Sequence, residues 1–386
     1  MSAFAALRRA YRGLAVFWLN LCLAFAGANV LALAYLSVAG RRGAPRAAPT
    51  QDPGPLRKFF PQLGERELAE FLRESERTFE YEPFAQFREK AYAGRYVRIH
   101  PAGFRESQDQ GPWPPEEANF TVFVFGGSTV FGYGVPDNQT IASHLQRRLV
   151  DLGLAKPPRV YNFGRGAYFS TQERVLFEKL IVAGAVPDLA IFIDGLNDFH
   201  FKDGVPALTP LLEQLVEHFG EESPAMPVLL AKLPLARAVA RPSAFRILGG
   251  HPAPPPRAAK APERYDDAVV LRNVIRRYLV NKRLAEAAAR EFGARAAFVW
   301  QPVPTYRYHG PPPEHLGLHE YSRFGYPLMA DLVRREPPGR DFLWCADIQE
   351  GLDEPLYVDQ VHYSPALSDR IATCIVDLLL ERGLLG

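Results

Sequence analysis

Cysteine is scarce in this chain, with three residues among 386. There is no Cys-x-x-Cys pair and no Cys/His array, so the sequence gives no zinc-binding pattern and we expect no metal. Cys22 lies in a long apolar run, which leaves Cys345 and Cys374 as the one pair that a disulfide could join. A single disulfide fits an oxidising compartment, and two buried thiols are at least as compatible with the sequence.

An excess of charge of either sign is also missing. The 45 basic and 43 acidic residues are well mixed and give a net charge of +2. Proteins that bind DNA or RNA gather Lys and Arg on one face, so we expect no nucleic-acid partner. The chain is 47% hydrophobic and 23% charged. It is therefore long and apolar enough to bury a sizeable core, in one large domain or two ordinary ones.

Charge is absent altogether from residues 13–40, which are rich in Leu, Ala, Val and Phe. A membrane span needs about 20 apolar residues, whereas the apolar core of a cleaved signal peptide has only about 7–15. We predict a tail at 1–13 and a retained transmembrane anchor at 14–40 that makes the lipid bilayer a partner. Arginines flank both ends of the span and nearly balance the positive-inside rule. We expect a single-pass inner (cell) membrane protein with its large domain on the periplasmic side.

The composition changes again after this apolar run. Residues 41–85 begin as a tether rich in Pro, Gly and Arg and continue into an amphipathic helix pattern. We predict one folded domain at 86–386, with an insertion or lid at about 200–265, and no oligomeric state follows from the sequence. A second irregular stretch at 302–340 carries three histidines, including His319, which we interpret as solvated loop residues and not as metal ligands.

Short apolar runs alternate with helical patterns from Thr121 onward. This alternation is typical of βαβ units and a parallel sheet. The runs at 121–125, 189–194 and 296–300 are almost continuously apolar. Such runs are expected in strands that helices cover on both faces. The sequence therefore predicts an α/β fold.

Helix boundaries can be located in the sequence as well. Ser170 and Glu173 have the spacing of a capping box ahead of an apolar run. A long helical pattern occupies 266–292 and leads into the strand predicted next. Ser364 followed by Pro365 is typical of the start of a helix, here the last one.

Polar residues follow the predicted strands, where parallel sheets bind their ligands. Ser128 lies in a glycine-rich turn, "GGST", after the strand at 121–125. Alone this is a weak signal, and the G-x-S-x-G elbow of α/β-hydrolases is absent because Val130 stands two residues after the serine. The turn "NFGRGAYFST" offers backbone N–H groups, and Asn197 offers an amide after the strand at 189–194. Both kinds of donor suit a developing oxyanion, and both also occur in ordinary turns.

A possible base and its carboxylate occur together in "YVDQVHYSP", where Asp359 and His362 stand three residues apart before the last helix. Acyl transfer to a serine needs a base to take the hydroxyl proton and a carboxylate to orient that base. A short loop segment can supply both. Considered alone, a surface Asp and His near a helix start is the simpler interpretation.

Together the four segments are more specific than any one of them. In order and spacing, "FGGSTVFGYG", "NFGRGAYFSTQE", "GLND" and "DQVH" resemble the four blocks of the SGNH hydrolase superfamily, the GDSL esterases and lipases. The resemblance covers residues 120–205 and 355–380. It implies a flavodoxin-like three-layer α/β/α sandwich with a parallel sheet, here preceded by one transmembrane helix.

The resemblance also implies roles for individual residues. Ser128 would be the nucleophile, His362 the general base and then acid, and Asp359 the orienting carboxylate. The oxyanion hole would be formed by the N–H of Ser128, the side-chain amide of Asn197 and an N–H of Gly166 or Ala167. Two departures stand out: Gly127 replaces the aspartate that usually precedes the serine, and Ala167 stands where the second block usually has glycine.

Serine chemistry of this kind means ester hydrolysis or acyl transfer through an acyl-enzyme, with no metal or organic cofactor. For an anchored member we expect small O-acyl esters, mainly acetyl, on an envelope or exported polysaccharide, with lipid esters as another substrate class. An O-acyltransferase to a sugar hydroxyl would use the same triad. A non-enzymatic membrane-tethered module that recruits a polysaccharide-modifying partner is the remaining alternative, but it would not require all four motif residues.

Overall fold

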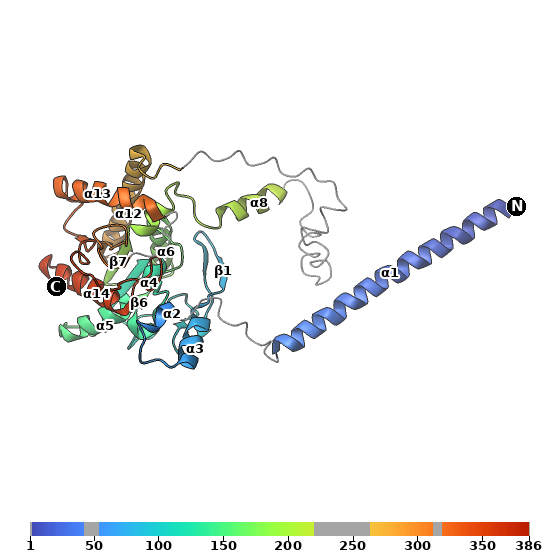
Figure 1. Ribbon diagram of the computed structural model, residues 1–386, viewed down its shortest axis with the longest axis horizontal. Coiled ribbons are helices and arrows are strands. Elements are labelled where there is room, and N and C mark those ends of the chain that lie inside the picture. Colours follow the sequence, from blue (N-terminus) through green and yellow to red (C-terminus); the bar gives the residue numbers. More distant parts are fainter. Residues whose placement is uncertain (1, 42–53, 220–262, 312–318, 386) are drawn as a thin grey trace. The chain divides into compact units, whose positions relative to one another are not determined.

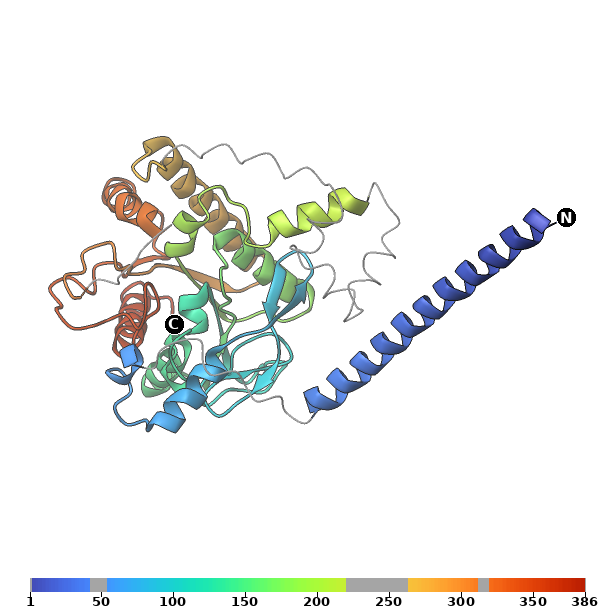
Figure 2. The ribbon, with the colours of Figure 1, turned by 45° about the vertical axis from the view of Figure 1, so that its right-hand side comes forward.

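A computed structural model of the chain describes residues 2–41, 54–219, 263–311 and 319–385. Residues 49–209 and 264–386 form one unit, and residues 1–48 and 210–263 form another (Figures 1 and 2). The elements are α1 (Ser2–Arg41), α2 (Gly54–Arg57), α3 (Glu65–Ser75), β1 (Phe79–Glu82), β2 (Gln86–Glu89), β3 (Tyr92–Ala93), β4 (Arg98–Ile99), β5 (Phe120–Gly126), α4 (Ser128–Phe131), the 3₁₀ turn η1 (Asp137–Gln139), α5 (Ile141–Asp151), β6 (Pro158–Asn162), α6 (Ser170–Val182), β7 (Leu189–Asp194), α7 (Leu196–His200), α8 (Thr209–Phe219), α12 (Ala268–Glu291), β8 (Arg295–Trp300), α13 (Glu320–Arg335), β9 (Phe342–Trp344) and α14 (Pro365–Glu381).

The larger unit is built on a five-stranded parallel sheet with the strand order β6-β5-β7-β8-β9. Counted along the sheet this is the order 2-1-3-4-5 of flavodoxin-like folds. Such sheets bind ligands where the order reverses, which here is the gap beyond β5 and β7. Ser128 follows β5, and Asn197 follows β7. The fold therefore brings two of the predicted site residues to the same edge of the sheet.

Helices cover both faces of this sheet. The side chains of β5 alternate, so Phe123 and Phe125 enter the core formed with α6, α12 and α13, whereas Val122 and Val124 enter the core formed with α5 and α14. Figure 1 shows α12 and α13 on one side of the sheet and α5 and α14 on the other. Burial on both faces explains the nearly continuous apolar strand sequences. The predicted three-layer α/β/α sandwich is confirmed.

Two local predictions need correction. The capping box at the start of α6 is wrong: Phe169 is the N-cap residue, and no side chain caps the helix. The hydroxyl of Ser170 instead donates to the buried carboxylate of Asp198 (2.6 Å), and a carboxylate acceptor binds more strongly than a neutral N–H partner would. The stretch 302–340 is also less irregular than expected, because it contains α13.

A hairpin precedes the sheet and belongs to the same unit. Its strands β1 and β2 are antiparallel, with Phe79 opposite Glu89 and Glu82 opposite Gln86. The predicted boundary between 85 and 86 therefore falls inside the hairpin. Just before it, the expected amphipathic helix is present as α3, which buries an apolar stripe of Leu68, Phe71 and Leu72.

Cys345 and Cys374 form a disulfide with an S–S distance of 2.11 Å. It joins the residue that follows β9 to α14. Of the two alternatives that the sequence left open, the structure contains the cross-link and not the free thiols. Cys22 is a free cysteine in α1.

Within the smaller unit, α1 contains a segment, Arg8–Leu31, that is long and apolar enough to cross a membrane by length and composition. The helix begins at Ser2, so the predicted tail at 1–13 is helical. Most of the predicted tether, residues 42–53, and most of the predicted insertion, residues 220–262, lie outside the described residues. The described part of the insertion includes α8.

Candidate active site

Ser128, His362 and Asp359 are connected by hydrogen bonds. Ser128 is the first residue of α4, directly after the tight turn at the end of β5. Its Oγ lies 2.8 Å from Nε2 of His362, although the two residues are 234 positions apart in sequence. Nδ1 of His362 lies 2.6 Å from Oδ2 of Asp359. A carboxylate can only accept, so Nδ1–H donates to Asp359 and leaves Nε2 to accept the serine proton.

Asp359 is fixed by its own backbone. Its Oδ1 accepts the N–H groups of Val361 and His362, each at 2.9 Å. Burial raises the pKa of Asp359, but His362 and the two N–H donors outweigh burial and hold the pKa well below its usual range. The side chain is 47% exposed, so water screens part of this interaction. The carboxyl is therefore ionised at neutral pH and keeps the His362 ring in one orientation.

Asn197 lies beside the serine turn. Its Nδ2 donates one hydrogen to the carbonyl of Tyr168 (2.6 Å) and has a second hydrogen to offer. A Cβ at Gly127 would lie 2.2 Å from that nitrogen. The amide therefore packs directly against the residue before Ser128, and any side chain at position 127 would displace it.

The two candidate donors of the second block differ in the structure. The N–H of Gly166 donates to Oε1 of Glu89 at 2.8 Å. Ala167 adopts φ +58°, in the left-handed region that favours glycine. Its N–H has no acceptor within the described part of the chain. Ala167 therefore adopts a backbone conformation that favours glycine, and its N–H is the one still available.

Gln301 is a site residue that the sequence interpretation missed. It is buried and directly follows β8. Its Oε1 accepts the hydroxyl of Thr129 (2.9 Å) and that of Tyr363 (2.7 Å). Thr129 and Tyr363 are the neighbours of Ser128 and His362, so one amide braces the two segments that carry these candidate residues. Its position just beyond an apolar strand was the available signal.

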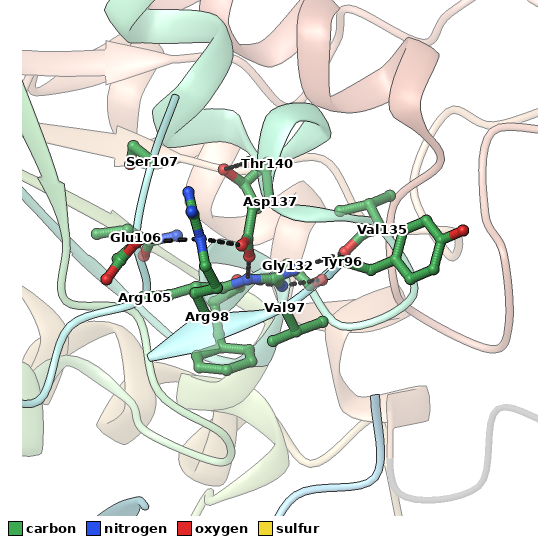
Figure 3. Close-up of polar contacts among 12 residues, drawn as sticks. Tyr96, Val97, Arg98, Arg105, Glu106, Ser107, Gly132, Val135, Asp137 and Thr140 are labelled. Carbon is green, nitrogen blue, oxygen red and sulfur yellow. Dashed lines mark hydrogen bonds and ion pairs between the residues drawn. The ribbon is translucent and has the colours of Figure 1, made fainter. Parts of the chain in front are cut away.

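The loop after α4 is held by a buried arginine, which Figure 3 shows pointing toward Asp137 and Gly132. Arg105 is 1% exposed and pairs with Asp137 through Nε at 2.9 Å. Its terminal nitrogens donate to the carbonyls of Phe131 (2.9 Å), Gly132 (2.6 Å) and Val135 (2.8 Å). Arg105 lies outside the four sequence blocks, so no motif pointed to it.

One of the histidines that we expected to be solvated is partly buried. His319 stacks on His200 with ring centroids 4.6 Å apart. Burial, with help from His200 and His362, lowers the pKa of His319 to about 4. It is therefore a neutral ring at physiological pH. In the described ranges no group of three or more His, Cys, Asp or Glu side chains could hold a metal ion. His315 lies outside those ranges.

No protein-family model and no curated protein matches the sequence. Among solved structures, the chain is similar to a member of the lipolytic protein G-D-S-L family from Veillonella parvula (11% identity, 67% of this chain and 96% of that chain, TM-score 0.34). It is also similar to a carbohydrate acetylesterase from Sinorhizobium meliloti (14% identity, 68% of this chain and 98% of that chain, TM-score 0.34). A third similar structure is a lipase from a goat rumen metagenome (11% identity, 67% of this chain and 97% of that chain, TM-score 0.38). With TM-scores below 0.5, these likenesses identify neither the substrate nor the reaction of this chain.

Three carboxyl groups are buried next to one another. Glu173 of α6, Asp194 at the end of β7 and Asp198 of α7 are 1%, 3% and 0% exposed. Burial raises the pKa of all three, and for Glu173 the charges of Asp194 and Asp198 raise it further. Folding therefore favours the protonated form of Glu173. Below the ordinary pKa of a carboxyl group, this proton makes its full contribution to the free energy of unfolding. The contribution is lost as the pH rises toward the pKa that Glu173 has in the folded protein.

We expect Glu173→Gln to stabilise the fold at neutral and alkaline pH. The amide copies the protonated carboxyl, so the free energy of unfolding should rise by about 1–3 kcal/mol at pH 8 and change little at pH 4. Denaturant unfolding at several pH values would measure this. Glu178→Gln is the control, because Glu178 lies on the same helix, is 41% exposed and pairs with Arg174. A gain in stability at pH 4 equal to that at pH 8 would contradict the prediction.

Proposed function

We propose that this protein is a serine esterase of the SGNH type, acting through an acyl-enzyme on Ser128. The observation that carries the proposal is the hydrogen-bonded series Ser128–His362–Asp359, with distances of 2.8 and 2.6 Å. It lies at the crevice where flavodoxin-like sheets bind ligands. Beside it are the N–H of Ala167, which has no acceptor among the described residues, and the second hydrogen of the Asn197 amide.

In the proposed reaction, Oγ of Ser128 bonds to the acyl carbon while its proton moves to Nε2 of His362. The carbonyl electrons move onto the oxygen, which the N–H groups of Ser128 and Ala167 and the amide of Asn197 stabilise. The ester C–O bond then breaks, and the leaving alkoxide takes the proton from His362. Water repeats these steps on the acyl-enzyme, which releases the acid and restores Ser128. Asp359 remains ionised throughout.

We further propose that the substrate is a small O-acyl ester, mainly acetyl, on an envelope or exported polysaccharide, and that α1 anchors the protein in the inner membrane. Two features support a periplasmic site. The apolar segment Arg8–Leu31 has the length and hydropathy of a membrane span. The Cys345–Cys374 disulfide is typical of proteins in oxidising compartments.

A fluorophosphonate probe tests the proposal directly, because it reacts only with an activated serine. The wild-type protein should be labelled, and Ser128→Ala should not. Release of free acetate from acetylated model sugars, measured with and without a sugar acceptor, then separates hydrolysis from transfer. A folded wild-type protein that takes up no label would refute the esterase, and acetate that appears only on the acceptor would make the protein an O-acyltransferase.

Asn197→Ala is expected to lower kcat by about 10²–10³-fold, the usual cost of losing one oxyanion-hole donor. KM should change little, because the hydrogen bond forms fully only when the carbonyl oxygen becomes charged. Steady-state hydrolysis of a chromogenic acetyl ester would measure both constants. Asn281→Ala is the control, since that buried amide bonds to Ser170 and Thr171 on α6. An equal loss in both variants would point to general disruption of the fold.

A further inference from the structure

The second block is fastened to the hairpin that precedes the sheet. Glu89, the last residue of β2, is 3% exposed. Its Oε1 accepts the N–H of Gly166 at 2.8 Å and the hydroxyl of Tyr133 at 3.3 Å. A buried carboxylate destabilises a fold unless its oxygens are hydrogen-bonded, so these two contacts are what make its position tolerable.

The same hairpin holds the other end of the turn. The hydroxyl of Tyr168 donates to the carbonyl of Phe87 at 2.5 Å. The carbonyl of Tyr168 in turn accepts the amide of Asn197 at 2.6 Å. Ala167 lies between these two attachment points, at Gly166 and Tyr168. Both proposed donors of the oxyanion hole outside the serine turn are thus connected to residues of β2.

The charged and polar groups around Glu89 fit a structural role for its side chain. Burial raises the pKa of Glu89, and the Gly166 N–H and the nearby Arg165 offset only part of this rise. Burial also raises the pKa of Tyr133, so its hydroxyl stays protonated and donates to the carboxylate. The Tyr133 ring lies 5.6 Å from the ring of His362. Within the described residues, Glu89 makes no hydrogen bond to Ser128 or His362.

We infer that Glu89 is a positioning residue of the oxyanion hole. By holding the N–H of Gly166, it fixes the turn in which Ala167 has its left-handed conformation, so that the next N–H is left for the substrate. Without this acceptor, the buried N–H of Gly166 would have to find another partner, and the turn would shift to provide one. The inference rests on the proposed function of Ser128, and Glu89 itself does not touch the reacting ester.

The test compares three variants of the full-length protein. Glu89→Ala removes the acceptor, and we expect kcat to fall by about 10–100-fold with KM within about threefold, because a donor displaced by about 1 Å loses most of its effect. Glu89→Gln keeps a carbonyl oxygen for Gly166 and should restore kcat to within about threefold of wild type. Glu80→Gln is the matched control on β1: Glu80 pairs with Arg88, is 37% exposed and should leave kcat unchanged.

Two readouts separate positioning from other roles. Stoichiometric fluorophosphonate labelling counts folded active sites, so the loss in Glu89→Ala must appear as a lower kcat per labelled site. The pH profile of kcat should keep its shape in Glu89→Gln, whereas a general acid or base would alter it. If Glu89→Ala does not fold, Glu89→Asp replaces it, because the shorter side chain withdraws the carboxylate by about one C–C bond, ~1.5 Å.

Several outcomes would overturn the inference. They are wild-type kcat in folded Glu89→Ala or Glu89→Asp, an altered pH profile in Glu89→Gln, or an equal loss of kcat in Glu89→Gln and Glu89→Ala. Each leaves the esterase itself intact, provided that wild type is labelled at Ser128. Failure of wild type to react with the probe would refute the esterase instead, so the two failures are distinguishable.

Discussion

His362→Gln is expected to lower kcat by about 10⁴–10⁶-fold with the fold intact. Nε2 of His362 lies 2.8 Å from Oγ of Ser128, and no other base contacts that oxygen in the described part of the chain. Glutamine offers at most a weakly basic carbonyl oxygen, so the serine proton has no acceptor in the transition state. Esterase kinetics with a chromogenic acetyl ester would measure the loss.

His144→Gln is the matched control for this substitution. His144 lies on α5, and its Nδ1 is 2.9 Å from Asp369, so it contacts no member of the triad. Burial lowers the pKa of His144 to about 4, so glutamine replaces a neutral ring at this position. We expect wild-type kcat in this variant. Retention of more than about 1% of kcat in His362→Gln would mean that another group takes the serine proton.

The sequence predicts the central fold well because that information is local. The strands at 121–125, 189–194 and 296–300 are confirmed as β5, β7 and β8, since a strand buried on both faces must be apolar along its whole length. The start of α14 is equally local: Ser364 caps it by accepting the N–H of Leu367. In each case the residues that decide the structure lie inside the element or directly before it.

Site features that depend on distant partners were missed. Gln301 braces two segments through Thr129 and Tyr363, and its own neighbours in sequence give no sign of either contact. In the sequence, Glu89 is one polar residue in a short strand. Its hydrogen bond with the N–H of Gly166 is visible only in the structure. The predicted capping box at Ser170 is wrong for the same reason, because the Ser170 hydroxyl donates to the carboxylate of Asp198 on another helix.

The motifs bring candidate residues together but do not decide between neighbours. The sequence left Gly166 and Ala167 as equal candidates, and a hydrogen bond to a residue 77 positions away separates them. Likewise, the contact between Gly127 and the amide of Asn197 is not visible in the sequence. The order of the four blocks therefore indicates the class of chemistry, whereas the packing around them distinguishes the roles of individual residues.

Asp359→Asn is expected to lower kcat by about 10³–10⁴-fold while the protein stays folded. Oδ1 of Asp359 accepts the N–H groups of Val361 and His362, so the carbonyl oxygen of asparagine should take that position. Its NH₂ group then faces Nδ1 of His362. A donor there favours the tautomer with the proton on Nε2, which can no longer accept the proton of Ser128.

For Asp359→Asn, two quantities would be measured: kcat and the rate of fluorophosphonate labelling. Both should fall together, because both need the serine proton to be removed. Asp353→Asn, an exposed carboxylate six residues earlier, should match wild type in both. If Asp359→Asn kept the wild-type labelling rate, the carboxylate would hold only the loop, and His362 would be oriented by its packing against Tyr133, whose ring centroid lies 5.6 Å away. Asp359 is half exposed, and its side chain is bound to the backbone of its own loop. A large loss of kcat in Asp359→Asn would therefore report its role in orienting the imidazole.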